Sequence, residues 1–291
     1  MNPNDTVLWV IMDIKLVALD MDGTVLDSES KISALSITAI SELIAQNIHV
    51  VLCTGRTHSE LQMVLQVLPD LRFLICSNGA NVYDLYTRKS LYYNLLENKK
   101  IREIYRLLSG FDLMFEIYSD HKIYLDEYCW YHPEEYGAGF LKKLMAESRT
   151  PIADMSNFVE IFNKPAEKLN IFFKNRQDRS SAWDMCSRLD VALTSSIHEN
   201  FEINASSSNK GNALSFLLQY LHVPSYQTMA IGDSKNDISM MQTAGFKVAM
   251  GNAISEVKRI ADVVTESNDR DGVAAALYRY VLHTDGIRLK D

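Results

Sequence analysis

A short apolar run that ends in two acidic residues constrains this chain more than any other stretch. The run, Leu16-Val17-Ala18-Leu19, is apolar at every position and is followed at once by Asp20-Met21-Asp22-Gly23-Thr24. A run of this length bounded by polar residues is typical of a strand buried on both faces of a parallel sheet. Two neighbouring carboxylates resist joint ionisation. The stretch therefore predicts either an ordinary acidic turn or a site that uses both carboxylates.

Similar short runs that end in polar residues recur along the chain, with helical segments between them. Strands are predicted over 48–53 and 73–76; Thr54-Gly55-Arg56 follows the first and Ser77-Asn78-Gly79 the second. The alternation of strands and helices is the signature of a parallel sheet with right-handed crossovers. The same pattern resumes at Lys210. The later predicted strands are 229–231, 247–250 and 262–264, and the predicted helices of this part are 33–46, around 61–68, 211–221, from 236 and 272–282.

A different pattern separates the two parts. Hairpins are predicted over 114–125 and 191–203, and hairpins pair antiparallel strands. We therefore expect an α/β fold in which residues 1–86 and 208–291 form a Rossmann-like parallel-sheet core and 87–207 form an inserted α/β cap domain. The other predicted elements of the cap are helices over 99–108, 133–147 and 180–189 and a strand over 169–173.

Composition excludes several classes of protein. The chain has 291 residues, 47% of them apolar, and a net charge of -8, which argues against nucleic acid as a partner. No apolar run approaches the roughly 20 residues that span a membrane. Four cysteines far apart in the sequence predict free thiols and a cytoplasmic protein. Residues 1–11 are expected to be a loose extension unless the chain starts at Met12 rather than Met1. Both readings stay open, as does the oligomeric state.

Polar residues at the ends of the predicted strands are expected to meet, because ligands of open α/β sheets bind beyond the carboxyl ends of strands. Four carboxylates stand at two of these ends: Asp20, Asp22, Asp233 and Asp237. Such a cluster needs a cation, and hard oxygen ligands beside a phosphate suit Mg²⁺. The seven histidines show no spacing that suits zinc.

Four motifs stand in order along the chain: Asp20-Met21-Asp22-Gly23-Thr24, Thr54-Gly55-Arg56, Lys210-Gly211 and Gly232-Asp233-Ser234-Lys235-Asn236-Asp237. Two accessory stretches accompany them, Asn78-Gly79-Ala80 and Met250-Gly251-Asn252-Ala253. In this ordered set the chain resembles the haloacid dehalogenase superfamily of phosphatases, and within it the Cof-like sugar-phosphate phosphatases. The resemblance covers nearly all of residues 13–283, and the inserted block stands where that branch carries its large α/β cap.

The resemblance implies a role for each matching residue. Asp20 would be the nucleophile that forms an aspartyl-phosphate, and Asp22 the general acid and then the general base. Mg²⁺ would be bound by the Asp20 carboxylate, the Asp22 backbone carbonyl and Asp233. Asp237 is expected to orient these ligands or Lys210, with direct binding to the metal as the second possibility. The residues expected to bind the substrate phosphate are Met21, Thr54, Gly55, Lys210 and Asn236.

The leading hypothesis is therefore a Mg²⁺-dependent phosphatase that acts on a small phosphorylated metabolite, with a sugar phosphate as the expected class. A phosphosugar mutase of the same superfamily is one alternative, and a non-catalytic protein that binds a phosphometabolite is another. The presence of Asp20, Asp22, Lys210 and Asp233 argues against the non-catalytic reading. The sequence does not identify the metabolite or the cap residues that select it.

Overall fold

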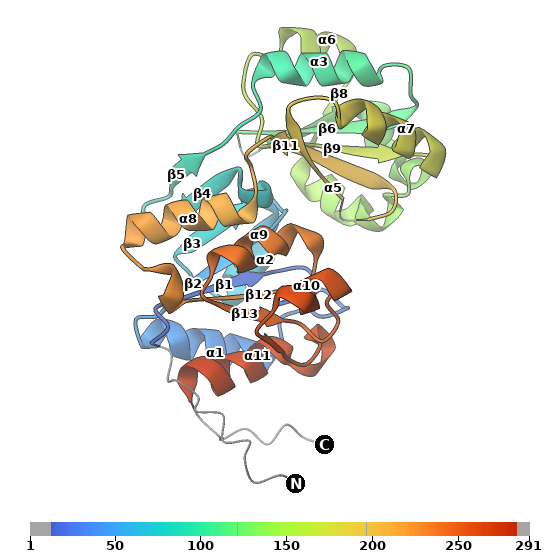
Figure 1. Ribbon diagram of the computed structural model, residues 1–291. Helices are drawn as coiled ribbons and strands as arrows, with labels where there is room; N and C mark the ends of the chain where they lie inside the picture. The colour runs from blue at the N-terminus through green and yellow to red at the C-terminus, as the bar shows by residue number, and fades with distance from the viewer. Residues whose placement is uncertain (1–12, 121, 196, 284–291) are drawn as a thin grey trace. The chain divides into compact units, whose positions relative to one another are not determined.

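The structure, a computed structural model, describes residues 13–120, 122–195 and 197–283 (Figure 1). The expected extension over 1–11 and the choice between Met1 and Met12 lie outside these residues. The strands are β1 (Leu16–Asp20), β2 (His49–Cys53), β3 (Phe73–Cys76), β4 (Asn81–Asp84), β5 (Lys89–Tyr93), β6 (Leu113–Ser119), β7 (Lys122–Asp126), β8 (Arg149–Ile152), β9 (Lys168–Phe173), β10 (Val191–Thr194), β11 (Asn200–Ala205), β12 (Thr228–Gly232), β13 (Phe246–Ala249) and β14 (Val263–Val264). The α-helices are α1 (Ala34–Ala45), α2 (Gln62–Val67), α3 (Asn98–Leu108), α4 (Glu127–Tyr131), α5 (Lys142–Ser148), α6 (Met155–Ile161), α7 (Arg176–Cys186), α8 (Lys210–Leu221), α9 (Ile238–Thr243), α10 (Ser255–Ile260) and α11 (Gly272–Leu277).

The chain divides into two compact units. The first contains the described residues up to Leu52, the segment Val67–Phe73 and the described residues from Leu214 onward. The second contains Cys53–Gln66 and the described part of Leu74–Ala213. The expected boundaries of the cap, between residues 86 and 87 and between 207 and 208, stay a prediction. The hairpin of β4 and β5 runs across the first of them.

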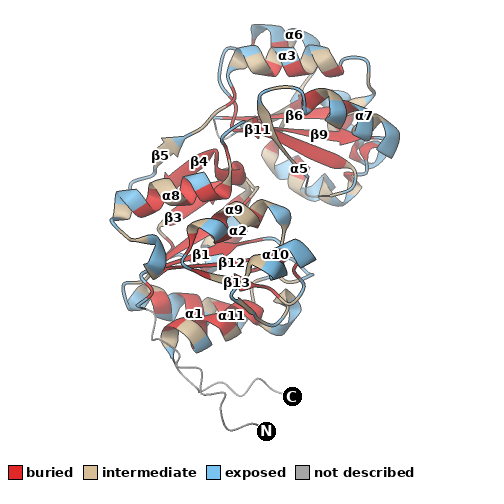
Figure 2. Ribbon diagram, in the orientation of Figure 1, coloured by how far each residue is buried: buried red, intermediate tan, exposed pale blue. Residues whose placement is uncertain are grey.

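The first unit is built on parallel strands in the order β14-β13-β12-β1-β2. Strands β1 and β12 are buried at every position (Figure 2), and their register sets Leu19 opposite Ile231. Helices α1 and α11 lie side by side on one face of these strands, and α8 and α9 lie on the other (Figure 1). Because both faces are covered, each strand could be recognised as an uninterrupted apolar run. The residues that follow β1 and β12 emerge at the same edge.

The second unit contains a mostly antiparallel six-stranded sheet in the order β10-β11-β9-β6-β7-β8. Alternate residues of β6 pack against different helices, because successive side chains of a strand point to opposite faces. Phe115 and Ile117 join a core with residues of α3, α6 and α7, whereas Met114 packs with residues of α4 and α5. Part of this second face carries buried polar side chains: Glu116, Tyr118, Lys168, Asn170, Asn200, Glu202 and Asn204.

The expected Rossmann-like parallel sheet and both expected hairpins are confirmed, but one expected helix is wrong. Residues 133–147 do not form a single helix. A 3-10 turn over Pro133–Tyr136 ends at Gly137, whose φ of 68° is left-handed, and α5 begins only at Lys142. A Cβ atom at Gly137 would lie 2.4 Å from Glu199 Cγ, so this position favours glycine, and its left-handed φ ends the turn.

Among the described residues, six further strands and α-helices were not expected from the sequence: β4, β5, β8, α4, α6 and α10. Strand β8 contains Pro151, which argues against a strand interior, but β8 lies at the edge of its sheet, where proline is tolerated. Across the described part of the chain, no helix combines the length and the apolar character needed to cross a membrane.

Candidate active site

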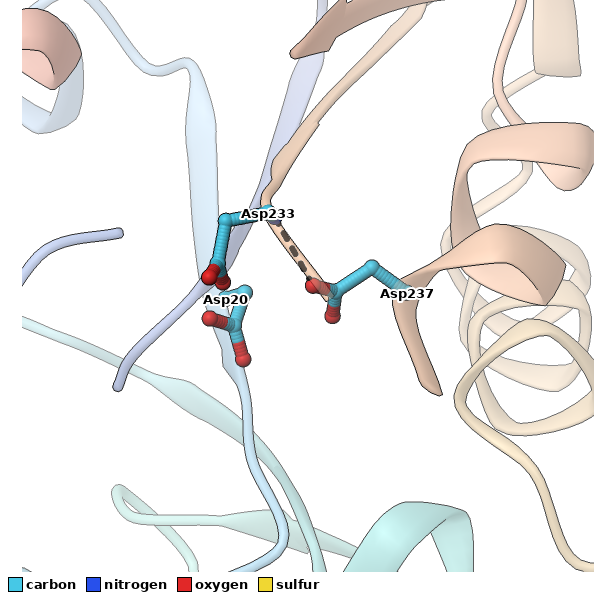
Figure 3. A group of neighbouring side chains, drawn as sticks. All are labelled: Asp20, Asp233 and Asp237. Carbon is cyan, nitrogen blue, oxygen red and sulfur yellow. Dashed lines mark hydrogen bonds between the residues drawn. The ribbon is translucent and has the colours of Figure 1, made fainter. Parts of the chain in front are cut away.

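Three carboxylates of the first unit converge at the ends of two adjacent parallel strands (Figure 3). Asp20 is the last residue of β1, Asp233 follows β12, and Asp237 ends a 3-10 turn over Lys235–Asp237. One carboxylate oxygen from each lies within 4.8 Å of the other two. Asp20 and Asp237 are buried and Asp233 is half-buried. The structure thus brings together three of the four carboxylates that the sequence singled out.

Asp237 is held by the backbone of its own loop. Its Oδ2 accepts hydrogen bonds from the N–H groups of Asp233, at 3.0 Å, and Ser234, at 2.9 Å. Gly232 leaves room for this arrangement, since a Cβ atom there would lie 2.6 Å from Asp237 Cβ. One oxygen of Asp237 is therefore used to fix the loop that carries Asp233, which agrees with an orienting role.

Asp233 is fixed from the loop that follows β1. Thr24 Oγ1 donates to Asp233 Oδ1 at 3.3 Å, and Ser234 Oγ donates to Oδ2 at 2.9 Å. A Cβ atom at Gly23 would lie only 2.7 Å from Asp233 Oδ2, and the φ of Gly23 is +82°. Both observations require glycine at this position. Gly23 thus lets the loop that follows β1 approach Asp233 of the fourth motif.

Asn252 supports the same loop. Its Nδ2 donates to the Gly23 carbonyl at 2.8 Å, and its Oδ1 accepts from the Asn268 N–H at 3.1 Å. Asn268 Nδ2 in turn donates to the Leu26 carbonyl at 3.0 Å. Sequence reasoning placed Asn252 at a strand end but missed Asn268, which lies in a polar loop with no motif of its own.

The other candidate residues of the first unit lie on the same loops as the cluster. Asp22 is exposed, and Met21 is buried with its carbonyl accepting from the N–H groups of Thr24 and Leu26. Asn236 is half-buried, in the turn that leads to Asp237. Their roles toward metal and phosphate stay predictions.

Thr54, Gly55 and Lys210 belong to the second unit. Thr54 is buried, and its Oγ1 accepts from the Arg56 N–H at 3.0 Å. Lys210 has no exposed surface and is the first residue of α8. A Cβ atom at Gly79 would lie 2.2 Å from the Asn209 carbonyl oxygen, so Gly79 allows its turn to approach the start of α8. The predicted phosphate contacts of these residues remain untested.

The cluster suits a divalent cation. Three carboxylate oxygens this close repel one another, and a hard cation offsets that repulsion while accepting oxygen ligands. Asp20 and Asp233 fit as ligands, with Asp237 close enough to bind or to orient them.

Comparison with known proteins identifies the family. The family model of the haloacid dehalogenase-like hydrolases matches residues 17–277 of this chain. The chain is 33% identical to phosphatase YwpJ of Bacillus subtilis, over 90% of this chain and 98% of that protein. It is also 33% identical to the 5-amino-6-(5-phospho-D-ribitylamino)uracil phosphatase YcsE of the same organism, over 93% of this chain and 97% of that protein.

Solved structures agree in fold. A haloacid dehalogenase-like hydrolase from Bacteroides thetaiotaomicron superposes with a TM-score of 0.80 at 27% identity, covering 91% of this chain and 99% of that one. Another from Bacillus subtilis gives 0.79 at 28% identity, covering 92% and 100%. The chain is therefore a phosphoric monoester hydrolase, and it belongs to the Cof-like branch of the haloacid dehalogenase-like hydrolases.

Proposed function

We propose that this protein is a Mg²⁺-dependent phosphatase that hydrolyses a small phosphorylated metabolite through an aspartyl-phosphate on Asp20. The convergence of the Asp20, Asp233 and Asp237 carboxylates at one sheet edge carries the proposal. Such a cluster combines a nucleophile with ligands for a cation, and phosphoryl transfer depends mostly on positioning and charge stabilisation.

The reaction divides between two carboxylates. A carboxylate oxygen of Asp20 attacks phosphorus, and the bond from phosphorus to the leaving oxygen breaks while protonated Asp22 donates its proton to that oxygen. Asp22, now a carboxylate, takes a proton from a water molecule that attacks the aspartyl-phosphate. The bond between phosphorus and Asp20 then breaks, which releases inorganic phosphate and restores both groups. The exposure of Asp22 supports its access to leaving group and water.

Mg²⁺ would be held by the Asp20 carboxylate, the Asp22 carbonyl and Asp233, with Asp237 orienting them. When bound, it would neutralise phosphate charge and lower the repulsion between the phosphate and the Asp20 carboxylate. The phosphoryl oxygens would be bound by the Thr54 hydroxyl, the Lys210 ammonium and the Asn236 amide, with backbone N–H groups of Met21 and Gly55 completing the set.

A phosphorylated sugar or polyol is the substrate class we propose. The named substrate of YcsE carries a phosphoribityl group, which supports this class over a nucleic acid. That YwpJ and YcsE are named phosphatases supports hydrolysis over a mutase reaction. A cytoplasmic location forms part of the proposal, and four buried cysteines that form no disulfide support it.

A phosphate-release assay tests this function. Purified protein, freed of metal by a chelator, is incubated with a panel of phosphorylated sugars, polyols, nucleotides and cofactors, with and without added Mg²⁺. We expect release from at least one sugar or polyol phosphate, only with Mg²⁺ and not with Asp20→Asn. Full activity in excess chelator would contradict the metal dependence, and release restricted to nucleotides would contradict the substrate class.

A further inference from the structure

The loop that carries Thr54 is held by side chains of the inserted sheet. Lys168 Nζ on β9 donates to the Gly55 carbonyl at 2.7 Å. Arg149 Nη1 on β8 donates to Glu60 Oε1 at 2.7 Å, and Glu60 Oε2 accepts from the Thr57 N–H at 3.1 Å. All five residues belong to the second unit. Two basic residues of the insert thus contact the segment that begins one residue after Thr54.

These basic side chains are buried and paired. Arg149 is 2% exposed and Lys168 4% exposed at the side chain. Lys168 Nζ also pairs with Glu202 Oε1 at 2.5 Å, and Arg149 Nε pairs with Glu116 Oε1 at 2.9 Å. Burying a charge costs free energy unless the charge is paired in good geometry, so these buried ion pairs are weak evidence that the fold is stabilised. They are better evidence that the paired side chains are held in one arrangement.

The contact of Lys168 reaches Thr54 through one peptide group. The Gly55 carbonyl and the Arg56 N–H belong to the same planar peptide, so fixing the carbonyl fixes the direction of the N–H. That N–H donates to Thr54 Oγ1 at 3.0 Å. A hydroxyl oxygen that accepts from the backbone has its own O–H directed elsewhere. Lys168 is therefore linked to the orientation of the Thr54 hydroxyl without touching it.

The partner of Lys168 is linked to the neighbouring strand end. Glu202 Oε2 accepts from Asn78 Nδ2 at 2.7 Å, and Asn78 has a left-handed φ of 57°. The side-chain amide of Asn78 therefore donates a hydrogen bond within the protein. The pair of Lys168 and Glu202 holds two of the loops that follow the strands, those at Gly55 and at Asn78.

We propose that Lys168 is a positioning residue for phosphate binding: through the Gly55–Arg56 peptide it orients the Thr54 hydroxyl toward a phosphoryl oxygen. This inference rests on the proposed function, in which Thr54 binds the substrate phosphate. It assigns to the inserted block a role in gripping the phosphoryl group, separate from any selection of the rest of the metabolite.

A double-mutant cycle with Thr54→Val tests the proposal. The variants are Lys168→Met and, to avoid a buried unpaired carboxylate, Lys168→Met/Glu202→Gln, each alone and combined with Thr54→Val. Lys174→Met is the matched control, because Lys174 follows β9 but pairs with the exposed side chains of Asp112 and Glu135. The readouts are kcat, KM and the inhibition constant of inorganic phosphate, with an aryl phosphate and the best metabolite as substrates.

We expect either Lys168 variant to lower kcat/KM and weaken inhibition by phosphate about tenfold or more, by the same factor for both substrates, because the phosphoryl group is what they share. In the Thr54→Val background the effect of the Lys168 change should largely vanish, and Lys174→Met should leave all readouts unchanged. Lys168→Arg, which keeps a charged donor, should recover part of the loss.

Three results would overturn the proposal. One is unchanged inhibition by phosphate in a folded Lys168→Met/Glu202→Gln variant. Another is a loss of kcat/KM that adds fully to the loss caused by Thr54→Val, as a merely structural role of Lys168 would give. The third is a loss that depends on the leaving group, which would make Lys168 a contact of the metabolite. Failure of the proposed function is separate, because it would appear as no phosphate release by the unaltered protein.

Discussion

At the scale of single residues, the active site depends on close approaches that only glycine permits. Gly23 and Gly232 lie where a Cβ atom would come within 2.7 Å or less of the carboxylate-bearing side chains of Asp233 and Asp237. The glycines of the first and fourth motifs therefore serve the geometry of the carboxylate cluster as much as the conformation of the backbone.

Gly23→Ala is expected to weaken metal binding. The new methyl group would push the Asp233 carboxylate from its position, and the φ of +82° would add strain. Since groups that orient metal ligands change affinity about 10- to 100-fold when lost, we expect a shift of that size in the Mg²⁺ concentration for half-maximal activity. Gly110→Ala is the control, because a Cβ atom at Gly110 meets nothing within 4 Å. Equal Mg²⁺ titrations for the two variants would show that Gly23 has no such role.

Lys210→Met is expected to reduce turnover about 10²-fold or more, as the loss of one preorganised charged donor does. A lysine at the first position of a helix opposes the helix dipole, and Lys210 is fully buried there. We propose that the substrate phosphate is the anionic group that accounts for that placement. Lys31→Met, which removes an exposed lysine, is the control. Near-normal kcat in a folded Lys210→Met variant would remove Lys210 from the phosphate site.

At the scale of helices and strands, the sequence predicted those elements that a local residue pattern determines. Strands such as β1 and β12 are buried on both faces, so each appears as an apolar run, and the polar residues that follow them had to meet at one edge. The predicted helix over 133–147 was wrong because Gly137, whose φ is left-handed, ends a 3-10 turn inside an otherwise helical pattern.

The contacts that complete the site could not be predicted in the same way. Thr24 meets Asp233 across 209 positions of sequence, and Lys168 meets Gly55 across 113. No local periodicity records such an approach, because it depends on the packing of the whole chain. The motifs located the residues, but their hydrogen-bond partners required the structure.

The contact between β8 and the turn after β2 should make stability depend on pH. Burial alone would raise the pKa of Glu60, but the charges of Arg149 and Lys168 outweigh it and lower that pKa below its usual 4.5. The carboxylate then contributes stability that is present above about pH 4.5 and is lost as the pH falls through the lower pKa of the folded state.

Glu60→Gln is therefore expected to lower Tm at pH 7 and to differ less from the unaltered protein as the pH falls below about 4.5. This Tm difference can be measured by thermal unfolding between about pH 3 and pH 7, a range that spans the usual and the lowered pKa of Glu60. Glu160→Gln is the control, since the exposed pair of Glu160 with Arg106 is screened by solvent and should change Tm little. A Tm difference for Glu60→Gln that is constant across the range would argue against an ionised Glu60 in the fold.

At the scale of the whole molecule, the family model matches residues 17–277, which include the inserted block. YwpJ is matched over 98% of its length, so the insert is shared with a protein named as a phosphatase. The inserted sheet has one face covered by helices and part of the other lined with buried polar groups, some of which hold the loops after β2 and β3. In our account the insert therefore shapes the phosphate site as well as selecting the metabolite.

The covalent role of Asp20 is the central claim, and trapping the phosphoenzyme tests it most directly. Asp22→Asn should slow hydrolysis of the intermediate more than its formation from an aryl phosphate, whose good leaving group needs little protonation. After acid quench in the presence of Mg²⁺, we expect intact-mass analysis of this variant to show one added phosphoryl group, labile to hydroxylamine and mapped to Asp20. The same treatment of Asp20→Asn should show none, with no turnover. A phosphoryl group on another residue, or continued turnover by folded Asp20→Asn, would contradict the account.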